Sequence, residues 1–211
     1  MLARLSLLAL CACLAAAPAY AKDKPAAFSC TGVFGPDSSE ALLKQTYGAE
    51  NVVTGMVDGA EGEQMLATTV FPKNPEKSME FGWQNDDTRE RLGFVYLPPS
   101  MSGPHGLRVG MSVDDVVAIN GKPFTIGGFW WDYGGGAQIE TGALANGDDD
   151  KSCFLSLAFV PNDDYPQDLD VSAVSGEVSI PTDEPLLKKL GVHLSQISIS
   201  YAYPEGDVPA E

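Results

Sequence analysis

The residues best suited to acid–base chemistry are two isolated histidines and one aspartate that stands beside two tryptophans. His105 lies in a Ser-Gly-Pro-His-Gly segment and could act as a general base if a serine and an aspartate converged on it. Asp132 could serve glycoside hydrolysis, since Trp130 and Trp131 could stack on sugar rings, but that reaction needs a second carboxylate across a cleft. His193 begins a predicted strand and indicates only polar surface. A hydrolase that uses Asp132 or His105 is therefore one alternative.

Other patterns for catalysis or cofactor binding are missing from the sequence. There is no Gly-x-Ser-x-Gly nucleophile segment, and the triple glycine at 134–136 lacks the Lys-Ser/Thr of a phosphate-binding loop. Acidic loops at 146–151 and 162–170 lack the Asp-x-Asp-x-Asp-Gly spacing of a calcium loop. We therefore expect a non-catalytic protein with no cofactor and no metal site.

A glycine-flanked aromatic segment is the strongest candidate for recognition. It contains Phe129, Trp130, Trp131, Asp132 and Tyr133, and large aromatic side chains dominate the energetics of protein interfaces. In a strand the two tryptophans would point to opposite faces, so at most one would lie fully in the core. The alternative is structural, with one tryptophan filling the core and the other covering a sheet edge.

The beginning of the chain has the pattern of a secretory signal peptide over residues 1–21. Arg4 precedes an apolar run over 5–17, and the Ala-Tyr-Ala motif ending at Ala21 suits cleavage before Lys22. A second possibility is lipidation at Cys13, since Leu-Cys-Ala-Cys loosely matches a lipoprotein box. We expect export to the periplasm and no stable transmembrane segment in the mature chain.

The charge excludes one class of partner and favours another. The formal net charge is -16, and loss of residues 1–21 removes one basic residue, leaving 12 basic and 29 acidic residues, or -17. Such an acidic protein repels nucleic-acid phosphates. The composition therefore favours an unknown protein partner that is basic or associated with the cell envelope, although acidity also serves solubility alone.

Two cysteines remain after the predicted cleavage, Cys30 and Cys153. In an oxidising compartment a pair of cysteines most simply forms one disulfide. The bridge would join the start of the mature chain to a strand 123 positions later.

The first predicted unit covers residues 22–100. After a short strand or extended segment at 28–33, Asp37 and Glu40 suggest a capping box for a helix that ends at Gly48. Four strands follow, at 51–57, 64–71, 77–83 and 92–97, as an antiparallel meander. In the third of these, Trp83 alternates with polar residues in a way typical of a core position.

The second unit covers residues 101–161, and a C-terminal β-helix-β extension covers 162–211. Ser112 and Asp115 form a capping box for a helix that Gly121 ends, and strands follow at 123–127 and 152–160. In the extension, we expect a strand at 170–180, a short helix capped by Thr182 or Asp183, and a strand at 192–203. The fold class is therefore α+β, with two tandem helix-plus-antiparallel-sheet units and this C-terminal addition.

Two resemblances rest on short motifs. Gly-Met-Ser at 110–112 with Asn-Gly-Lys-Pro at 120–123 resembles the repeat opening of the tandem-repeat beta-lactamase inhibitor protein and of BamE-type (SmpA/OmlA) outer-membrane lipoproteins. The Gly-Phe-x-Trp-Asp-Tyr-Gly-Gly segment at 128–135, with Val-Ser-Gly at 174–176, is similar to a group of uncharacterised secreted proteobacterial proteins. These resemblances imply the tandem fold and an envelope location.

The sequence thus predicts an exported binding or inhibitor-type protein of unknown target, which recognises a protein through an acidic surface and an aromatic turn. The first alternative is a cell-envelope assembly accessory resembling the BamE-type lipoproteins, which lipidation would favour. The second is the hydrolase described above.

Overall fold

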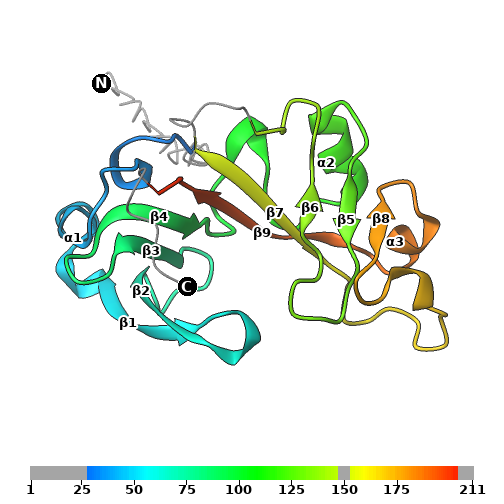
Figure 1. Ribbon diagram of the computed structural model, residues 1–211, viewed down its shortest axis with the longest axis horizontal. Helices are drawn as coiled ribbons and strands as arrows, with labels where there is room; N and C mark the ends of the chain where they lie inside the picture. The colour runs from blue at the N-terminus through cyan, green and yellow to red at the C-terminus, as the bar shows by residue number, and fades with distance from the viewer. Residues whose placement is uncertain (1–27, 147–152, 204–211) are drawn as a thin grey trace, which may run out of the picture.

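A computed structural model describes residues 28–146 and 153–203 of the 211-residue chain (Figure 1). The predicted signal peptide, the possible lipidation site and most of the acidic loop at 146–151 lie outside the described residues. Within them the helices are α1 (Glu40–Tyr47), α2 (Val113–Asn120) and α3 (Pro185–Lys189). The strands are β1 (Val52–Asp58), β2 (Gln64–Val70), β3 (Met79–Asn85), β4 (Glu90–Tyr96), β5 (Thr125–Gly127), β6 (Ala137–Gln138), β7 (Phe154–Val160), β8 (Ser179–Pro181) and β9 (His193–Ser200). Short 3-10 helices are η1 (Gly32–Phe34), η2 (Ala49–Asn51), η3 (Ala60–Gly62), η4 (Pro104–Gly106) and η5 (Ser172–Val174).

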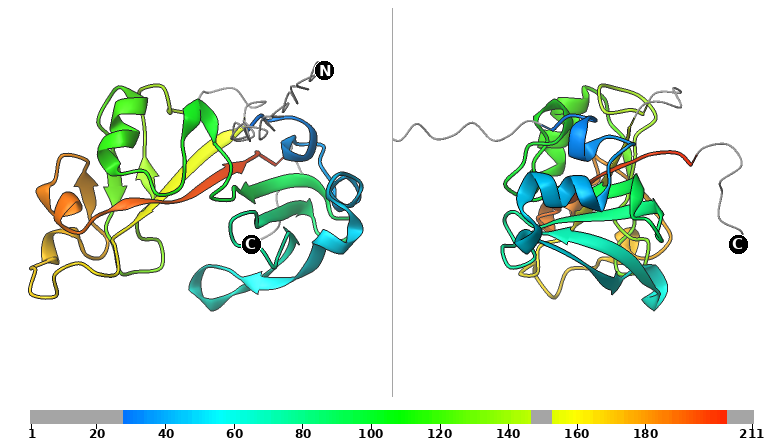
Figure 2. Two further views of the ribbon diagram at one scale, coloured as in Figure 1. Left: turned by 180° about the vertical axis from the view of Figure 1, so that it is seen from behind. Right: turned by 90° about the vertical axis from the view of Figure 1, so that its left-hand side faces the viewer.

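The fold is α+β, as predicted, and its main sheet has six strands in the order β1-β2-β3-β4-β9-β7. Strands β1 to β4 form the expected antiparallel meander. Helix α1 lies against β1 and β2 in this meander, and the side view in Figure 2 shows it in front of the strands. The buried side of α1 is centred on Leu43, which is fully buried, so the helix is stabilised mainly by packing.

Strand β9 connects the two halves of the molecule. It pairs with β4 on one side and with β7 on the other, and β7 and β9 together run from one half of the molecule to the other (Figure 1). The register with β7 shifts between Ala158 and Phe159, where Ser195 is the extra residue on β9. This bulge explains why the alternation of apolar residues slips beside Gln196 while Leu194 and Ile197 both stay buried.

A second antiparallel sheet has the order β6-β5-β8, and α2 and α3 lie beside it (Figure 1). The C-terminal segment therefore contributes to both sheets, through β8 in the small one and β9 in the large one. Its strands do not pair with each other in a separate unit, since each is inserted next to strands from earlier in the chain.

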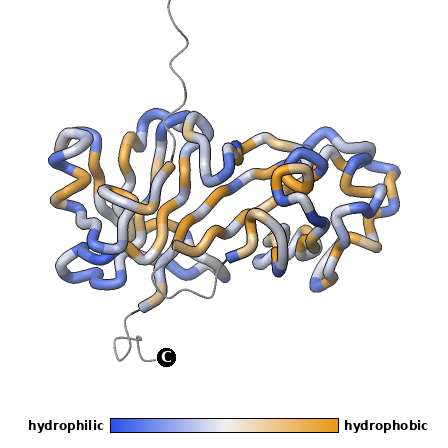
Figure 3. The backbone as a smooth tube through the Cα atoms, turned by 90° about the horizontal axis from the view of Figure 1, so that it is seen from above, coloured by the Kyte–Doolittle hydropathy of each residue, from blue (hydrophilic) through white to orange (hydrophobic). Residues whose placement is uncertain are grey.

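One apolar core runs along the length of the molecule. Figure 3 shows hydrophobic and hydrophilic residues alternating along the strands, as expected for sheets with one buried face. Trp83 is 5% exposed, which confirms its predicted core position, and its indole Nε1 donates a 2.9 Å hydrogen bond to Thr68 Oγ1. The predicted disulfide between Cys30 and Cys153 is present, with the Cα atoms 6.1 Å apart.

The strand predicted at 170–180 was mostly wrong because a local turn replaces it, and the strand or extended segment predicted at 28–33 ends in another turn. Residues 28–33 contain the 3-10 turn η1, in which Gly32 has a φ of 63° and Gly35 N–H donates to Gly32 O. In the segment 170–180, Asp170 Oδ1 accepts from Ser172 N–H at 3.0 Å and initiates η5, so only β8 at its end is a strand. Side-chain bonds of this kind compete with sheet formation.

Helix ends were predicted with mixed success. The Ser112–Asp115 capping box of α2 is present, and Gly121 ends that helix in the left-handed conformation. Helix α1 is capped by Ser39 rather than Asp37, because Glu40 sits inside the helix and forms ion pairs with Lys44 and Arg89. Likewise, Glu184 rather than Thr182 or Asp183 caps α3.

Candidate functional site

The predicted recognition segment is an irregular turn between β5 and β6, which we call the aromatic turn (residues 128–136). Its glycines are required by close backbone contacts. A Cβ at Gly135, whose φ is 78°, would lie 2.0 Å from Phe159 O, and one at Gly128 would lie 2.2 Å from Gly176 O. Only glycine allows the chain to approach its neighbours so closely at these two positions.

Backbone hydrogen bonds fix the aromatic turn to the segment that precedes β8. Gly128 N–H donates to Val178 O at 2.7 Å, and Phe129 N–H donates to Val174 O at 2.8 Å. In return, Gly176 N–H donates to Phe129 O at 2.9 Å. The turn therefore has a defined backbone conformation although it belongs to neither sheet.

The first aromatic residues of the turn have different environments. Phe129 is buried in the core, whereas Trp130 is 49% exposed and has a φ of 61°. The ring centroid of Trp130 lies 5.8 Å from that of Phe129 and 5.9 Å from that of Tyr165. A left-handed backbone is an outlier for a bulky residue, so Trp130 is held outward on a backbone that disfavours it.

Of the other two aromatic residues, Trp131 is bound within the turn, and Tyr133 contacts the β1–β2 hairpin. Trp131 is half-buried, and its Nε1 donates a 2.9 Å hydrogen bond to Gly128 O. Tyr133 is 56% exposed, and its hydroxyl donates a 2.7 Å hydrogen bond to Glu61 Oε1. This hydrogen bond, with the nearby carboxylates, raises the pKa of Tyr133. Figures 1 and 2 show the end of the hairpin next to the turn.

The tryptophan pair lies in the predicted aromatic turn and not in a strand, so the opposite-face argument for a strand does not apply to it. Residues 130 and 131 lie in a turn, and neither side chain is fully in the core, because Phe129 takes that place. The predicted alternative, with one tryptophan in the core and the other over an edge, does not describe this geometry.

Two hollows flank the aromatic turn. One, of about 290 Å³, lies between Trp130 and the segment that contains Asp163 and Tyr165. The other, of about 460 Å³, lies between Tyr133 and the segment that contains Glu177. Neither is lined by a lysine or an arginine, so the charged groups at both are carboxylates.

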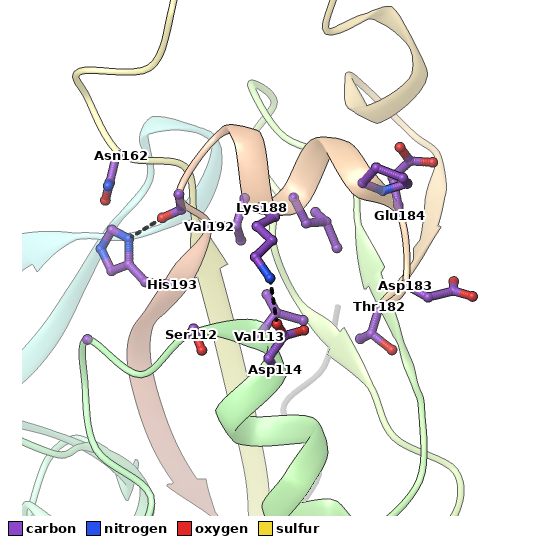
Figure 4. Close-up of a pocket in the computed structure, with 14 residues that line it drawn as sticks. Ser112, Val113, Asp114, Asn162, Thr182, Asp183, Glu184, Lys188, Val192 and His193 are labelled. Atoms are coloured by element: carbon purple, nitrogen blue, oxygen red, sulfur yellow. Dashed lines mark hydrogen bonds and ion pairs between the residues drawn. The ribbon is translucent and has the colours of Figure 1, made fainter.

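A larger pocket of about 660 Å³ lies between the first turn of α2 and the α3 region (Figure 4). Buried Val113, Leu187 and Val192 contribute its apolar lining. Lys188 Nζ reaches toward Asp114 Oδ2 at 3.6 Å, and both side chains are largely exposed.

The ionisable groups of this pocket do not converge on one point. In Figure 4, His193 lies on the side of Asn162, while Asp183 and Glu184 lie on the opposite side. His193 Nδ1 is 3.1 Å from Gly191 O, and Glu184 Oε1 accepts from Leu186 N–H, so both groups have local partners. The arrangement suits binding of an apolar group better than acid–base chemistry.

The two predicted catalytic candidates lie in different places. His105 is exposed in η4 and borders a hollow that also contains Cys30 and Cys153. Asp132 is exposed in the aromatic turn, and it does not line that hollow. No triad or carboxylate pair is therefore assembled from His105 and Asp132 among the residues that the structure describes.

Sequence reasoning missed two residues of the site. Tyr165 packs against Trp130, and its position as the aromatic residue of an acidic loop could have indicated a packing role. Glu61 binds Tyr133 from 72 residues away, and no sequence signal indicates that contact.

Comparisons of the chain with protein-family models, with curated proteins and with solved structures gave no match. The resemblance to the inhibitor protein, to BamE-type lipoproteins and to the secreted proteobacterial group therefore stays a prediction. Within residues 28–146 and 153–203, no helix combines the length and apolar character needed to cross a membrane. The same residues contain no cluster of three or more histidines, cysteines or acidic residues suited to a metal ion.

Proposed function

We propose that the protein is an exported, non-catalytic binding or inhibitor-type protein that recognises a basic surface of another protein through the aromatic turn. The observation that carries this proposal is the pair Trp130 and Tyr133, about half exposed on a backbone that hydrogen bonds fix in place. Isolated exposed apolar residues are common, but two large aromatic rings in one rigid turn are typical of interface hot spots.

Rigidity supports the proposal on energetic grounds. Binding loses affinity when loops and side chains must be ordered, so a turn already fixed by Gly128 and Gly135 avoids part of that loss. Trp130 also keeps an unfavourable backbone conformation while presenting its ring to solvent. Backbone strain of this kind clusters at functional sites, which favours recognition over a purely structural role.

Charge supports a basic partner. Asp132 is exposed within the turn, and Asp163 and Glu177 line the hollows on its two sides. Arginine suits this combination, because a guanidinium stacks on aromatic faces and pairs with carboxylates. We therefore expect an arginine-rich surface on the partner and an affinity that falls as salt concentration rises.

Export is the second part of the proposal. The Cys30–Cys153 disulfide is consistent with an oxidising compartment, since such bridges are rare in the reducing cytosol. Together with the predicted signal peptide, this favours the periplasm. The mass of the purified mature protein tests the route: a chain that begins at Lys22 supports ordinary cleavage, and a lipidated Cys13 would overturn it.

The binding role is tested by affinity capture from envelope extract with the wild-type protein and two variants. Trp130→Ala removes the exposed ring, and Trp130→Tyr is the matched control that keeps an aromatic side chain on the same backbone. We expect a partner that the wild type and Trp130→Tyr retain at low salt, and that Trp130→Ala loses. Equal capture by all three folded proteins would overturn the proposed site.

A further inference from the structure

Strand β1 is an open edge of the main sheet. Phe71 N–H donates to Asn51 O at 2.8 Å, and Gly59 N–H donates to Glu63 O at 2.7 Å, which fixes the hydrogen-bonded positions of the β1–β2 ladder. In an antiparallel pair these positions alternate, so odd-numbered residues of β1 bond to β2. The backbone groups of the even-numbered residues point away from the sheet, and these residues are Val52, Thr54, Met56 and Asp58.

This edge lacks the features that normally protect an edge strand. Its register with β2 is continuous over the whole strand, without a bulge, and β1 contains no lysine or proline. Val53 is 53% exposed and Met56 is 57% exposed. Among the described residues, the amide of Val52 is the only outward-facing amide of β1 with a hydrogen-bond partner, and it donates to Ala49 O.

The opposite edge of the same sheet is closed. Asn146 Oδ1 accepts from Leu155 N–H at 2.7 Å, and Asn146 Nδ2 donates to Leu155 O at 3.0 Å. Further along β7, Phe159 N–H donates to Gly135 O at 2.9 Å. Within residues 28–146 and 153–203, one edge is therefore covered by the chain itself and the other is left accessible.

The charges around β1 indicate what kind of strand would pair with it. From Gln45 to Pro72 the chain contains four acidic residues and no lysine or arginine; the four are Glu50, Asp58, Glu61 and Glu63. An antiparallel second copy centred on Gly55 would bring Asp58 of one chain close to the Glu50 end of the other. Like charges at both ends of the pairing disfavour self-association and favour a basic strand.

The edge is also continuous with the proposed recognition site. The Tyr133–Glu61 hydrogen bond joins the aromatic turn to the end of the β1–β2 hairpin (Figures 1 and 2). A strand added along β1 would therefore have one end beside Tyr133. An arginine at that end could reach both the ring and the Glu61 carboxylate.

We propose that β1 binds an extended, basic segment of the partner as a seventh strand of the main sheet. This inference rests on the proposed function, because it describes how the same partner would be held. Main-chain hydrogen bonds to Thr54, Met56 and Asp58 would supply affinity, and the acidic ends of the strand would supply selectivity.

The direct test uses a synthetic peptide of alternating lysine and valine, and a peptide of the same length with glutamate in place of lysine. Amide hydrogen exchange is followed by NMR in the wild-type protein. We expect the lysine peptide to slow exchange at Thr54, Met56 and Asp58, while Val53, Gly55 and Val57 are already protected. The glutamate peptide should leave the exchange unchanged.

Several outcomes would overturn the inference. They are no added protection with the lysine peptide, equal protection with both peptides, and protection that rises with protein concentration alone, which would assign the edge to a second copy. The NMR measurement needs no substitution, so it does not depend on whether a variant folds.

Two variants separate this inference from the proposed function. Met56→Pro removes an outward-facing amide without breaking the β1–β2 ladder, and Met56→Thr is the control that keeps the amide. We expect Met56→Pro to bind the lysine peptide about tenfold more weakly than Met56→Thr, the effect of a lost main-chain contact. If the envelope partner is lost by Trp130→Ala but fully retained by Met56→Pro, the proposed function stands and the strand addition is refuted.

Discussion

Trp130 combines an exposed ring with a backbone conformation that side chains disfavour. Its φ of 61° lies in the left-handed region, where non-glycine residues are destabilised by about 1–2 kcal/mol. We expect Trp130→Gly to be more stable than Trp130→Ala by about 1 kcal/mol, because both lose the ring and only glycine relieves the backbone. Urea unfolding of the two variants measures the difference. Equal stabilities would mean that residue 130 leaves the left-handed region once the ring is gone.

The largely buried carboxylate of Glu40, paired with two partly exposed cations, makes stability depend on acid pH. Burial alone would raise the pKa of Glu40, but Lys44 and Arg89 outweigh it and hold the pKa below its ordinary value of 4.5. The folded protein therefore binds fewer protons here than the unfolded chain, and this stabilisation is lost as pH falls below about 4.5 through the folded pKa. Since both cations are partly exposed, we expect Glu40→Gln to lower the free energy of unfolding by only about 1–2 kcal/mol at neutral pH.

Unfolding of the Glu40→Gln variant and the wild type in urea across the acid range checks this sign. The difference in free energy of unfolding between wild type and variant should narrow as pH falls, because protonated glutamate and glutamine both carry no charge. A gap that stays constant or widens toward acid pH would contradict the assignment of Glu40 as a stabilising carboxylate.

At the scale of elements, the aromatic turn depends on one glycine much more than on its neighbour. Gly135→Ala would place a Cβ 2.0 Å from Phe159 O at a φ of 78°, whereas a Cβ at Gly136 meets nothing within 4 Å. We expect Gly135→Ala to destabilise the protein by at least about 2 kcal/mol and Gly136→Ala by less than about 0.5 kcal/mol. Thermal unfolding compares the stabilities of the two variants. Similar losses in both would show that the turn shifts its backbone to accommodate the added Cβ.

Features set by local spacing were the most predictable from the sequence, whereas features that depend on which distant segment lies alongside were harder to predict. The capping box of α2 joins Ser112 to Asp115 within one turn, so spacing alone reveals it. The spacing of Asp37 and Glu40 predicted the cap of α1, but Ser39 caps this helix, and its first residue Glu40 pairs with Arg89 from the turn between β3 and β4. The aromatic residues of the site and their place in a glycine-flanked turn were evident from the sequence, but the left-handed backbone of Trp130 and the Tyr133–Glu61 contact were not.

At the scale of the whole molecule, the strand order was the least accessible feature. The meander β1-β2-β3-β4 follows the chain, so consecutive hairpins predict it. The insertion of β9 between β4 and β7 follows from pairings such as Val95 with Ile199 and Leu155 with Ile199, which no local pattern encodes. The open edge at β1 depends on this order and became visible only in the structure.

The disulfide constrains the molecule at this largest scale. It joins Cys30, near the start of the described chain, to Cys153 before β7, across 123 positions. The chain-entropy model predicts that a bridge of this span stabilises the folded protein by nearly 5 kcal/mol. Removal of a native bridge typically lowers the free energy of unfolding by about 2–5 kcal/mol. We expect Cys30→Ser, Cys153→Ser and the double variant to lower the free energy of unfolding equally, by an amount within that range. The reason is that each variant removes the same single bridge.

Urea unfolding without reductant provides a second, independent signature of this mechanism. A bridge acts mainly on the unfolded chain by keeping it compact, so its removal should expose more surface on unfolding and increase the denaturant slope m. Wild-type protein treated with dithiothreitol should match the double variant in both midpoint and slope. A lower midpoint with an unchanged slope would instead show that loss of the bridge destabilises the folded state, through lost packing around the half-buried cysteines.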